Sequence, residues 1–196
     1  MGILGIYASQ ISGHLANYAY ESIATVTVGA GGQSNISFSS IPSTYKHLQI
    51  RGIAQDNRTT YNQSSFGFRF NGDSGSNYSY HFLQASWGAG ATGVDSMGSG
   101  SQNQAYSVGS IVSSVTANTF GSFVIDILDY ANTNKYKTIR GLSGADANSA
   151  TGYRPIPRLG SGSWQSTSAI NSMTIYSEFG SAFNQYSSFA LYGIKG

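Results

Sequence analysis

The 196-residue chain contains no cysteine and only three prolines, and charged residues make up just 9% of it. The absence of cysteine excludes disulfide bonds, thiolate metal sites and cysteine nucleophiles. The charged fraction is far below the roughly 25% of an average soluble domain, and the net charge is only +2. The ten lysines and arginines are scattered along the chain, so the sequence predicts no nucleic-acid surface.

Long hydrophobic runs are missing as well. No window approaches about 18 uninterrupted apolar residues, which predicts that the chain does not insert into a membrane. The first fifteen residues lack the basic region and the continuous apolar stretch of a secretory signal peptide. Hydrophobic residues nevertheless form 40% of the chain and aromatic residues 13%. This composition supplies enough apolar surface for a folded core.

Alternation of apolar and polar residues is the dominant pattern, and it predicts β-strands because successive side chains of a strand point to opposite faces. We expect a hairpin around the glycines at 29–32, and long surface loops at 86–104 and 143–163. Nine to eleven short, evenly spaced strands are typical of an all-β, jelly-roll-like β-sandwich, formed here by a single domain at 20–196. The pattern places these strands at 22–28, 36–38, 48–51, 66–70, 78–83, 106–115, 120–130, 135–142, 170–179 and 187–194.

The segment 120–130 is apolar on both faces. Phe123, Ile125 and Ile127 alternate along one face, whereas Val124 and Leu128 lie on the other. Such a strand is either central in its sheet or faces a second protein surface. We therefore expect a homo-oligomer, with this strand or the one at 187–194 near the subunit interface.

The first 19 residues differ from the rest of the chain and form a separate N-terminal arm in this interpretation. One alternative is that the arm folds onto its own sandwich. The other is that it docks on a neighbouring subunit or on another protein, since an apolar arm left in water would be adhesive. The docking hypothesis assigns the contact to the six large apolar residues of the arm: Ile3, Leu4, Ile6, Tyr7, Ile11 and Leu15.

No pattern of residues predicts a catalytic or metal site. His14, His47 and His81 never form a pair at the short spacing of metal ligands, and we expect His47 and His81 to be partly buried polar residues. The serine-centred G-x-S-x-G motif is absent, so a hydrolase interpretation has no anchor. The turn at 71–75 offers oxygen atoms but lacks the glutamate of a calcium-binding loop.

The acidic residues lead to the same conclusion. Asp126 and Asp129 are three residues apart, which places them on opposite faces of a strand, so we expect a turn or a cross-strand ion pair. Glu21 and Glu178 are the only glutamates, and no feature of the sequence brings them to the separation that a glycosidase requires. We predict that the protein is not an enzyme and uses no cofactor or metal.

Aromatic residues in predicted loops are the one site-like feature. Trp87, Trp164 and Tyr153 lie among glycine, serine and proline, where exposed rings can stack on sugars or anchor a subunit interface. For Trp164, which precedes a predicted strand, a place in the core or an interface is favoured. For Trp87 the glycan and packing alternatives stay open.

Five segments resemble small structural proteins of tailed bacteriophages. They are YESIATVTVG (20–29), NISFSSIPSTYKHLQIRG (35–52), FRFNGDSGSNYSYHFL (68–83), DYANTNKYKTIRGLSG (129–144) and YSSFALYGIKG (186–196). The proteins that these segments resemble are jelly-roll virion components that decorate capsids or tip tail fibres. The resemblance covers most of the chain after residue 20, and its motifs are structural rather than catalytic.

The resemblance implies a virion protein, commonly a homotrimer, whose partner is the major capsid protein or a tail protein. A capsid decoration (cement) protein would clamp neighbouring major capsid subunits. The alternative is a receptor-binding tail-fibre tip, or a glycan-binding head domain, that presents its loops to host glycans. The sequence favours the cement function, because the predicted head begins directly after an arm of 19 residues rather than after a long fibre shaft.

Overall fold

A computed structural model of the chain describes residues 19–61, 63–85, 93–114, 117–146 and 157–196. These residues form twelve β-strands, and none of them belongs to a helix long and apolar enough to span a membrane. The strands are β1 Tyr20–Thr27, β2 Asn35–Phe38, β3 His47–Asp56, β4 Gln63–Phe70, β5 Tyr78–Ala85, β6 Val94–Gln102, β7 Ala105–Ser113, β8 Gly121–Leu128, β9 Lys137–Gly144, β10 Arg158–Trp164, β11 Met173–Ser177 and β12 Ser188–Ile194.

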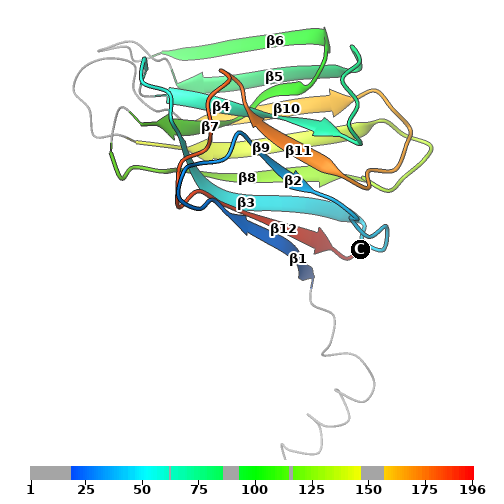
Figure 1. Cartoon of the computed structure of the whole chain (residues 1–196). Coiled ribbons are helices and arrows are strands. Elements are labelled where there is room, and N and C mark those ends of the chain that lie inside the picture. Colours follow the sequence, from blue (N-terminus) through cyan, green and yellow to red (C-terminus); the bar gives the residue numbers. More distant parts are fainter. Residues whose placement is uncertain (1–18, 62, 86–92, 115–116, 147–156) are drawn as a thin grey trace, which may run out of the picture.

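The strands form two layers that meet along one edge. The larger layer has the order β1-β12-β3-β8-β9-β10-β5-β6, and Figure 1 shows it from β6 at the top to β1 at the bottom. The smaller layer has the order β2-β11-β4-β7. Neighbours within each layer are antiparallel, and the layers are joined where the end of β3 runs parallel to β7, at Gln55–Val112 and Asp56–Ser113.

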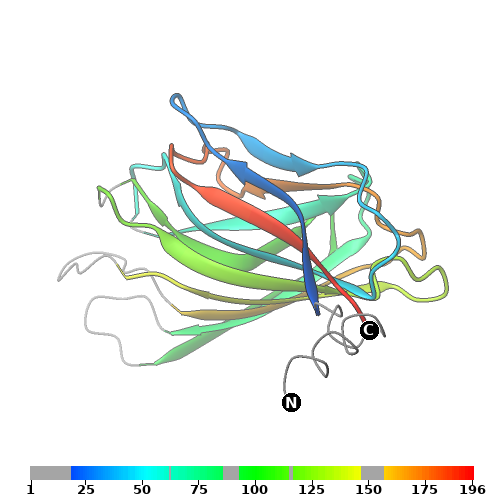
Figure 2. The ribbon, with the colours of Figure 1, turned by 90° about the horizontal axis from the view of Figure 1, so that it is seen from below.

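The strand order is that of a jelly roll with four additional strands. Without β5, β6, β9 and β10, the two layers reduce to β1-β12-β3-β8 and β2-β11-β4-β7, the eight-stranded double sheet of that fold. Figure 2 shows β1 and β12 side by side in one layer and β2 with β11 in the other. The additional strands extend the larger sheet beyond β8. The predicted all-β, jelly-roll-like sandwich is confirmed.

Two local predictions were wrong. The expected hairpin is not formed, because β1 pairs with β12 and β2 pairs with β11 in the opposite layer. The turn between them contains Gly31 and Gly32 at positive φ values of 95° and 76°, a conformation that glycine adopts without strain. The chain therefore crosses between the layers at this turn rather than folding back on itself.

The two predicted long loops also contain strands. Strand β6, Val94–Gln102, lies within the segment 86–104, and the segment 143–163 includes the end of β9 and most of β10. With these additions the described residues form more strands than the nine to eleven that the sequence predicts. Both strands are rich in glycine and serine, and these residue types lack the apolar alternation that marks a strand in a sequence.

The core lies between the two layers and is rich in aromatic rings. Phe66, Phe68 and Phe70 of β4 are fully buried, as expected from their alternation with small and polar residues. Phe66 packs against Phe123 of the opposite layer, with ring centroids 4.8 Å apart. Phe70 lies 5.6 Å from the ring of Trp164 in β10. The aromatic cluster thus ties the additional strands to the jelly roll.

Candidate functional site

A cavity of about 490 Å³ opens where the additional strands β5, β6 and β10 face β4 and β7. We call it the Arg158 pocket. Its buried lining consists of Arg158, Gln84, Phe82 and Ser65. More exposed residues surround them, from the 58–61 segment, strand β6 and the segment after β11. The volume lies within the roughly 300–1,000 Å³ typical of small-molecule sites.

Arg158 is the central residue of this pocket and is only 4% exposed. Its Nε and Nη2 atoms donate to Gln84 Oε1 at 3.0 and 2.6 Å, and Nη1 donates to Ser65 Oγ at 2.9 Å. The guanidinium lies 4.2 Å from the ring centroid of Phe82, a favourable cation–π contact. Burial lowers the pKa of Arg158 to about 10. The sequence places Arg158 on the inner face of β10, where alternation with exposed Leu159 points it into the molecule.

Behind the pocket, Ser107 links Arg158 to Glu178. Strand β7 bulges at this point, since its register with β4 shifts between Phe66 and Phe68, and Ser107 has a φ of 52°. Glu178 accepts hydrogen bonds from the Ser107 backbone N–H and from its hydroxyl, the latter at 2.8 Å. The Ser107 carbonyl accepts a hydrogen bond from Arg158 Nη1 at 3.3 Å. Bulges and strained non-glycine residues are enriched at functional sites.

Burial raises the pKa of Glu178 to about 7, against the lowering effects of its Ser107 hydrogen bond and of the Arg158 charge. Glu178 and Arg158 form no direct ion pair, because the Ser107 peptide lies between them. Oppositely perturbed ionisable groups that lie beside a cavity are a physical signature of a binding or catalytic site.

Two charged residues line the outer part of the pocket. The guanidinium of Arg58 lies 3.7 Å from the ring centroid of Phe179 and 4.6 Å from that of Tyr61. Asp95 of β6 lines the same cavity. Its Oδ2 atom is enclosed and has no hydrogen-bond partner within the described part of the chain. A buried carboxylate oxygen without a donor is costly, so a ligand donor there would be favoured.

A second feature lies on the outer face of the larger sheet. Val124, Leu142, Leu159 and Leu83 stand in register on the adjacent strands β8, β9, β10 and β5. They are 37%, 62%, 51% and 50% exposed. Three strand spacings make this row about 14 Å long. We call these four residues the apolar stripe.

A polar row runs beside the apolar stripe. Asp126 of β8 pairs across the strands with Arg140 of β9 at 2.6 Å and accepts a hydrogen bond from Gln49 Nε2 at 2.7 Å. Gln49 in turn accepts from Arg51, whose guanidinium lies 5.7 Å from the ring centroid of Tyr192. The predicted cross-strand ion pair is therefore present at Asp126, and an arginine–tyrosine contact lies at one end of the stripe.

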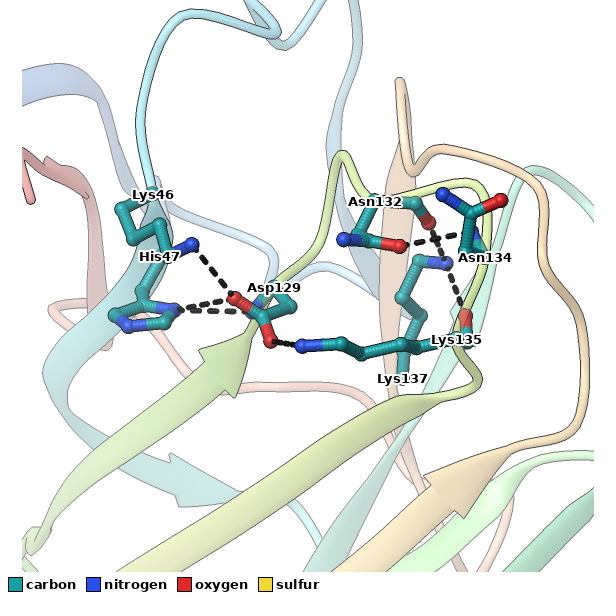
Figure 3. A network of polar contacts seen from close by, with 7 residues as sticks. All are labelled: Lys46, His47, Asp129, Asn132, Asn134, Lys135 and Lys137. Atoms are coloured by element: carbon teal, nitrogen blue, oxygen red, sulfur yellow. Dashed lines mark hydrogen bonds and ion pairs between the residues drawn. The ribbon is translucent and has the colours of Figure 1, made fainter.

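Asp129 joins the turn after β8 to the start of β3 (Figure 3). Its carboxylate lies 2.8 Å from Lys135 Nζ and 3.6 Å from Lys46 Nζ, and its backbone N–H donates to His47 Nδ1 at 2.9 Å. The hydrogen bond with Lys135 is the main cause that lowers the pKa of Asp129. These contacts fit the predicted structural role of Asp129 at a turn.

The same turn encloses the fully buried Lys137 (Figure 3). Its Nζ donates to the carbonyls of Asn132 at 2.6 Å and Lys135 at 2.9 Å, and to those of Ser166 and Thr167 at 3.5 and 3.3 Å. Burial lowers the pKa of Lys137. The ammonium thus cross-links two loops through backbone carbonyls, which is a structural arrangement rather than a catalytic one.

Of the aromatic residues singled out in the sequence, Trp164 is 2% exposed, and its indole N–H donates to Asp73 Oδ2 at 2.7 Å. Trp164 is a core residue, and the core was one of the two places that the sequence favoured for it. Its ring offers no surface to a sugar. Trp87 and Tyr153 lie outside the described residues. The arm residues Ile3, Leu4, Ile6, Tyr7, Ile11 and Leu15 also lie outside them.

The histidines and the 71–75 turn form no metal site in the part of the chain that the structure describes. His47 is partly buried as predicted, but His81 is exposed, which contradicts its prediction. It lies on the outer face of β5 and packs over Gly98 of β6, the strand that the sequence did not reveal. Asp73 accepts hydrogen bonds from Gly75 N–H at 2.8 Å and from Asn77 Nδ2 at 3.0 Å. Its carboxylate oxygens therefore stabilise the turn.

Sequence reasoning missed the Arg158 pocket, because Arg158 and Asp95 fall in segments expected to be loops. A weak signal was present: Arg158, Gly160, Gly162 and Trp164 alternate with outward-facing residues along β10. In the comparisons with known proteins, no family model matches the chain and no curated protein matches it.

Proposed function

We propose that the protein is a structural component of a tailed-phage virion, of the capsid decoration (cement) type. Three observations support this: the jelly-roll strand order, the five sequence segments that resemble virion proteins, and the apolar stripe on the larger sheet. In this proposal the chain is a homotrimer on the capsid surface. Its N-terminal arm, residues 1–19, attaches to the major capsid protein.

The apolar stripe is the observation that carries the proposal. Adjoining exposed apolar residues on the face of a sheet are suited to burial against another protein surface, and subunit interfaces combine such residues with arginine and tyrosine. The stripe begins beside Arg51, which contacts the rings of Tyr20 and Tyr192. We assign this face to the contact between copies of the chain, in agreement with the expectation that the strand at 120–130 lies near an interface.

The substitution Leu142→Glu tests this assignment. A charge in the middle of the stripe would have to be buried unpaired on association, so we expect sedimentation to show dissociation of the oligomer. Thr138→Glu is the matched control, because Thr138 is exposed on the same face of the same strand, outside the stripe. A monomeric wild-type protein that also fails to assemble on particles would overturn the proposal. An oligomer unaffected by Leu142→Glu would rule out this face as the interface.

The second candidate is a receptor-binding or glycan-binding head at a tail tip. The Arg158 pocket favours it, because a cavity with buried polar groups and aromatic rings is suited to a ligand rather than to capsid clamping. The two candidates differ in the number of copies per particle, which is high for a decoration protein and low for a tail tip.

A further inference from the structure

We propose that the Arg158 pocket binds an acidic saccharide, with the sugar carboxylate held by Arg58 and a sugar hydroxyl held by Asp95. The inference rests on the second candidate function and names its ligand class. Both ligand-binding residues line one cavity but come from distant segments, the chain before β4 and the edge strand β6.

The pocket is rigid at its base. Gln84 and Ser65 are 8% and 2% exposed, and each accepts a hydrogen bond from Arg158. The Arg158 guanidinium has five N–H donors, and the contacts to Gln84, Ser65 and Ser107 employ four of them. Within the described residues, one Nη2 hydrogen is left for a ligand. Because these donors are already held in place, binding a ligand to them costs little conformational entropy.

Arg58 supplies the selectivity for an anion. Its guanidinium is stacked on Phe179 and Tyr61, and stacking on a ring leaves the N–H groups at the edge of the guanidinium plane able to donate. Its Nη1 also donates to the Gln63 carbonyl, at 3.5 Å. The geometry of an arginine edge matches a carboxylate in a bidentate manner. The charged residues that line the cavity are two arginines, Arg58 and Arg158, and one carboxylate, Asp95. Asp56 and Glu178 interact with these arginines from outside the lining, and burial raises the pKa of both carboxyls.

Asp95 indicates that the ligand also carries hydrogen-bond donors. Asp95 lines the cavity and its enclosed Oδ2 has no partner among the described residues, so a rotation of the side chain toward the cavity would bring this oxygen to a sugar hydroxyl. The aromatic rings of Phe82, Tyr61 and Phe179 line the same cavity. An arginine covers one face of each ring, so the C–H groups of a sugar ring would pack against the ring edges and uncovered faces. Like an acidic saccharide, a free amino acid carries a carboxylate and a hydrogen-bond donor. It has less apolar ring surface for these three aromatic residues, so the saccharide is favoured.

The test is an NMR titration of the full-length protein with glucuronic acid, N-acetylneuraminic acid and a short oligogalacturonate, with glucose as the neutral probe. We expect acidic sugars to bind at least about tenfold more tightly than glucose, and Arg58→Gln to remove about tenfold of that affinity. Asp95→Asn should weaken all sugars. Arg69→Gln is the matched control, since Arg69 is also stacked on a ring, that of Tyr176 at 5.0 Å, but does not line the pocket.

Each outcome decides between distinct conclusions. Glucose binding as tightly as the acids, with no effect of Arg58→Gln, would overturn the acidic class while leaving a glycan-binding head in place. Glutamate displacing the acidic sugars with higher affinity would assign the pocket to an amino acid or peptide terminus. If none of these saccharides binds, this inference fails, whereas the second candidate function is still decided by the number of copies per particle. Circular dichroism of each variant confirms that a loss of binding is not a loss of folding.

Discussion

The titration of Glu178 is coupled to the fold near neutral pH. Its carboxylate is held against a strained peptide, with Ser107 at a positive φ, and its pKa is raised to about 7 from an ordinary value of 4.5. Between these two values the folded state binds a proton that the unfolded state releases. The stability from this group is therefore full below pH 4.5 and is lost as the pH rises through 7.

This linkage predicts that the wild-type protein loses thermal stability between pH 5 and pH 8. Glu178→Gln mimics the protonated carboxyl and keeps a donor for the Ser107 hydroxyl and an acceptor for its N–H, so its melting temperature should fall less over the same range. The expected difference is about 1–2 kcal/mol after discounting for partial exposure, or roughly 3–6 °C. Differential scanning calorimetry at both pH values measures it.

Glu21→Gln is the control, because Glu21 is the other glutamate and its pKa is lowered, mainly by the hydrogen bond from Lys195. The stability that Glu21 provides is already present above pH 4.5 and is lost only on acidification. Its removal should shift the melting temperature equally at pH 5 and pH 8. Equal pH dependence of Glu178→Gln and wild type would contradict the assignment of the linkage to Glu178.

At the scale of strands, β7 approaches the additional strands β9 and β10 unusually closely. A Cβ atom on Gly160 would lie 2.6 Å from the Val108 carbonyl oxygen, and one on Gly141 would lie 2.3 Å from the same atom. Both glycines are on the inner face of the larger sheet, at paired positions of β9 and β10. The two layers pack at this point through backbone rather than through side chains.

We expect Gly160→Ala to destabilise the protein by about 1–3 kcal/mol, because the new methyl group meets backbone that cannot move aside without disturbing β7. Gly144→Ala is the control, since a Cβ at that position on the neighbouring strand β9 meets no atom within 4 Å. Urea unfolding followed by tryptophan fluorescence measures both. Equal stability of the two variants would show that the layers separate easily at this point.

The same close packing explains what the sequence could and could not predict. Where large side chains fill the core, as with Phe66, Phe68 and Phe70, alternation predicts the strand correctly. In β10 the inward positions include Gly160 and Gly162, which carry no hydrophobic signal, so the strand resembles a loop. The spacing of Asp126 and Asp129 predicted a cross-strand ion pair as one of two roles, and the structure identifies Arg140 as the partner of Asp126. The Arg158 pocket was not predictable, because it joins segments that only the strand order brings together.

At the scale of the whole molecule, both proposed binding surfaces involve the four strands that extend the jelly roll. The eight jelly-roll strands supply most of the aromatic core, and Tyr78 of β5 and Trp164 of β10 complete it. The inserted strands β5, β6, β9 and β10 provide Leu83, Leu142 and Leu159 of the apolar stripe on their outer face, and Arg158 and Asp95 of the pocket on the inner side. Ligand binding and self-association are therefore compatible in one chain, because they use opposite faces of the same extension.

The described residues form a sandwich with a continuous core of their own. Strand β1 begins at Tyr20 and pairs along its length with β12, and the buried hydrophobic residues of the described chain run from Val28 to Leu191. Deleting residues 2–15 should therefore leave the fold intact and the melting temperature of the isolated protein within a few degrees of wild type. This would separate the two alternatives for the arm, since an arm packed on its own sandwich would be needed for stability.

Attachment should respond differently to that deletion. The arm carries the six large apolar residues Ile3, Leu4, Ile6, Tyr7, Ile11 and Leu15, and fully burying one such side chain provides on the order of 1.5–3 kcal/mol before ordering costs. Even after its backbone is ordered, a docked arm should strengthen attachment by several kcal/mol. Co-sedimentation with capsids should therefore show far weaker retention of the truncated protein. Unfolding of the truncated protein would assign the arm to its own core, and unchanged retention of a folded protein would refute arm-mediated docking.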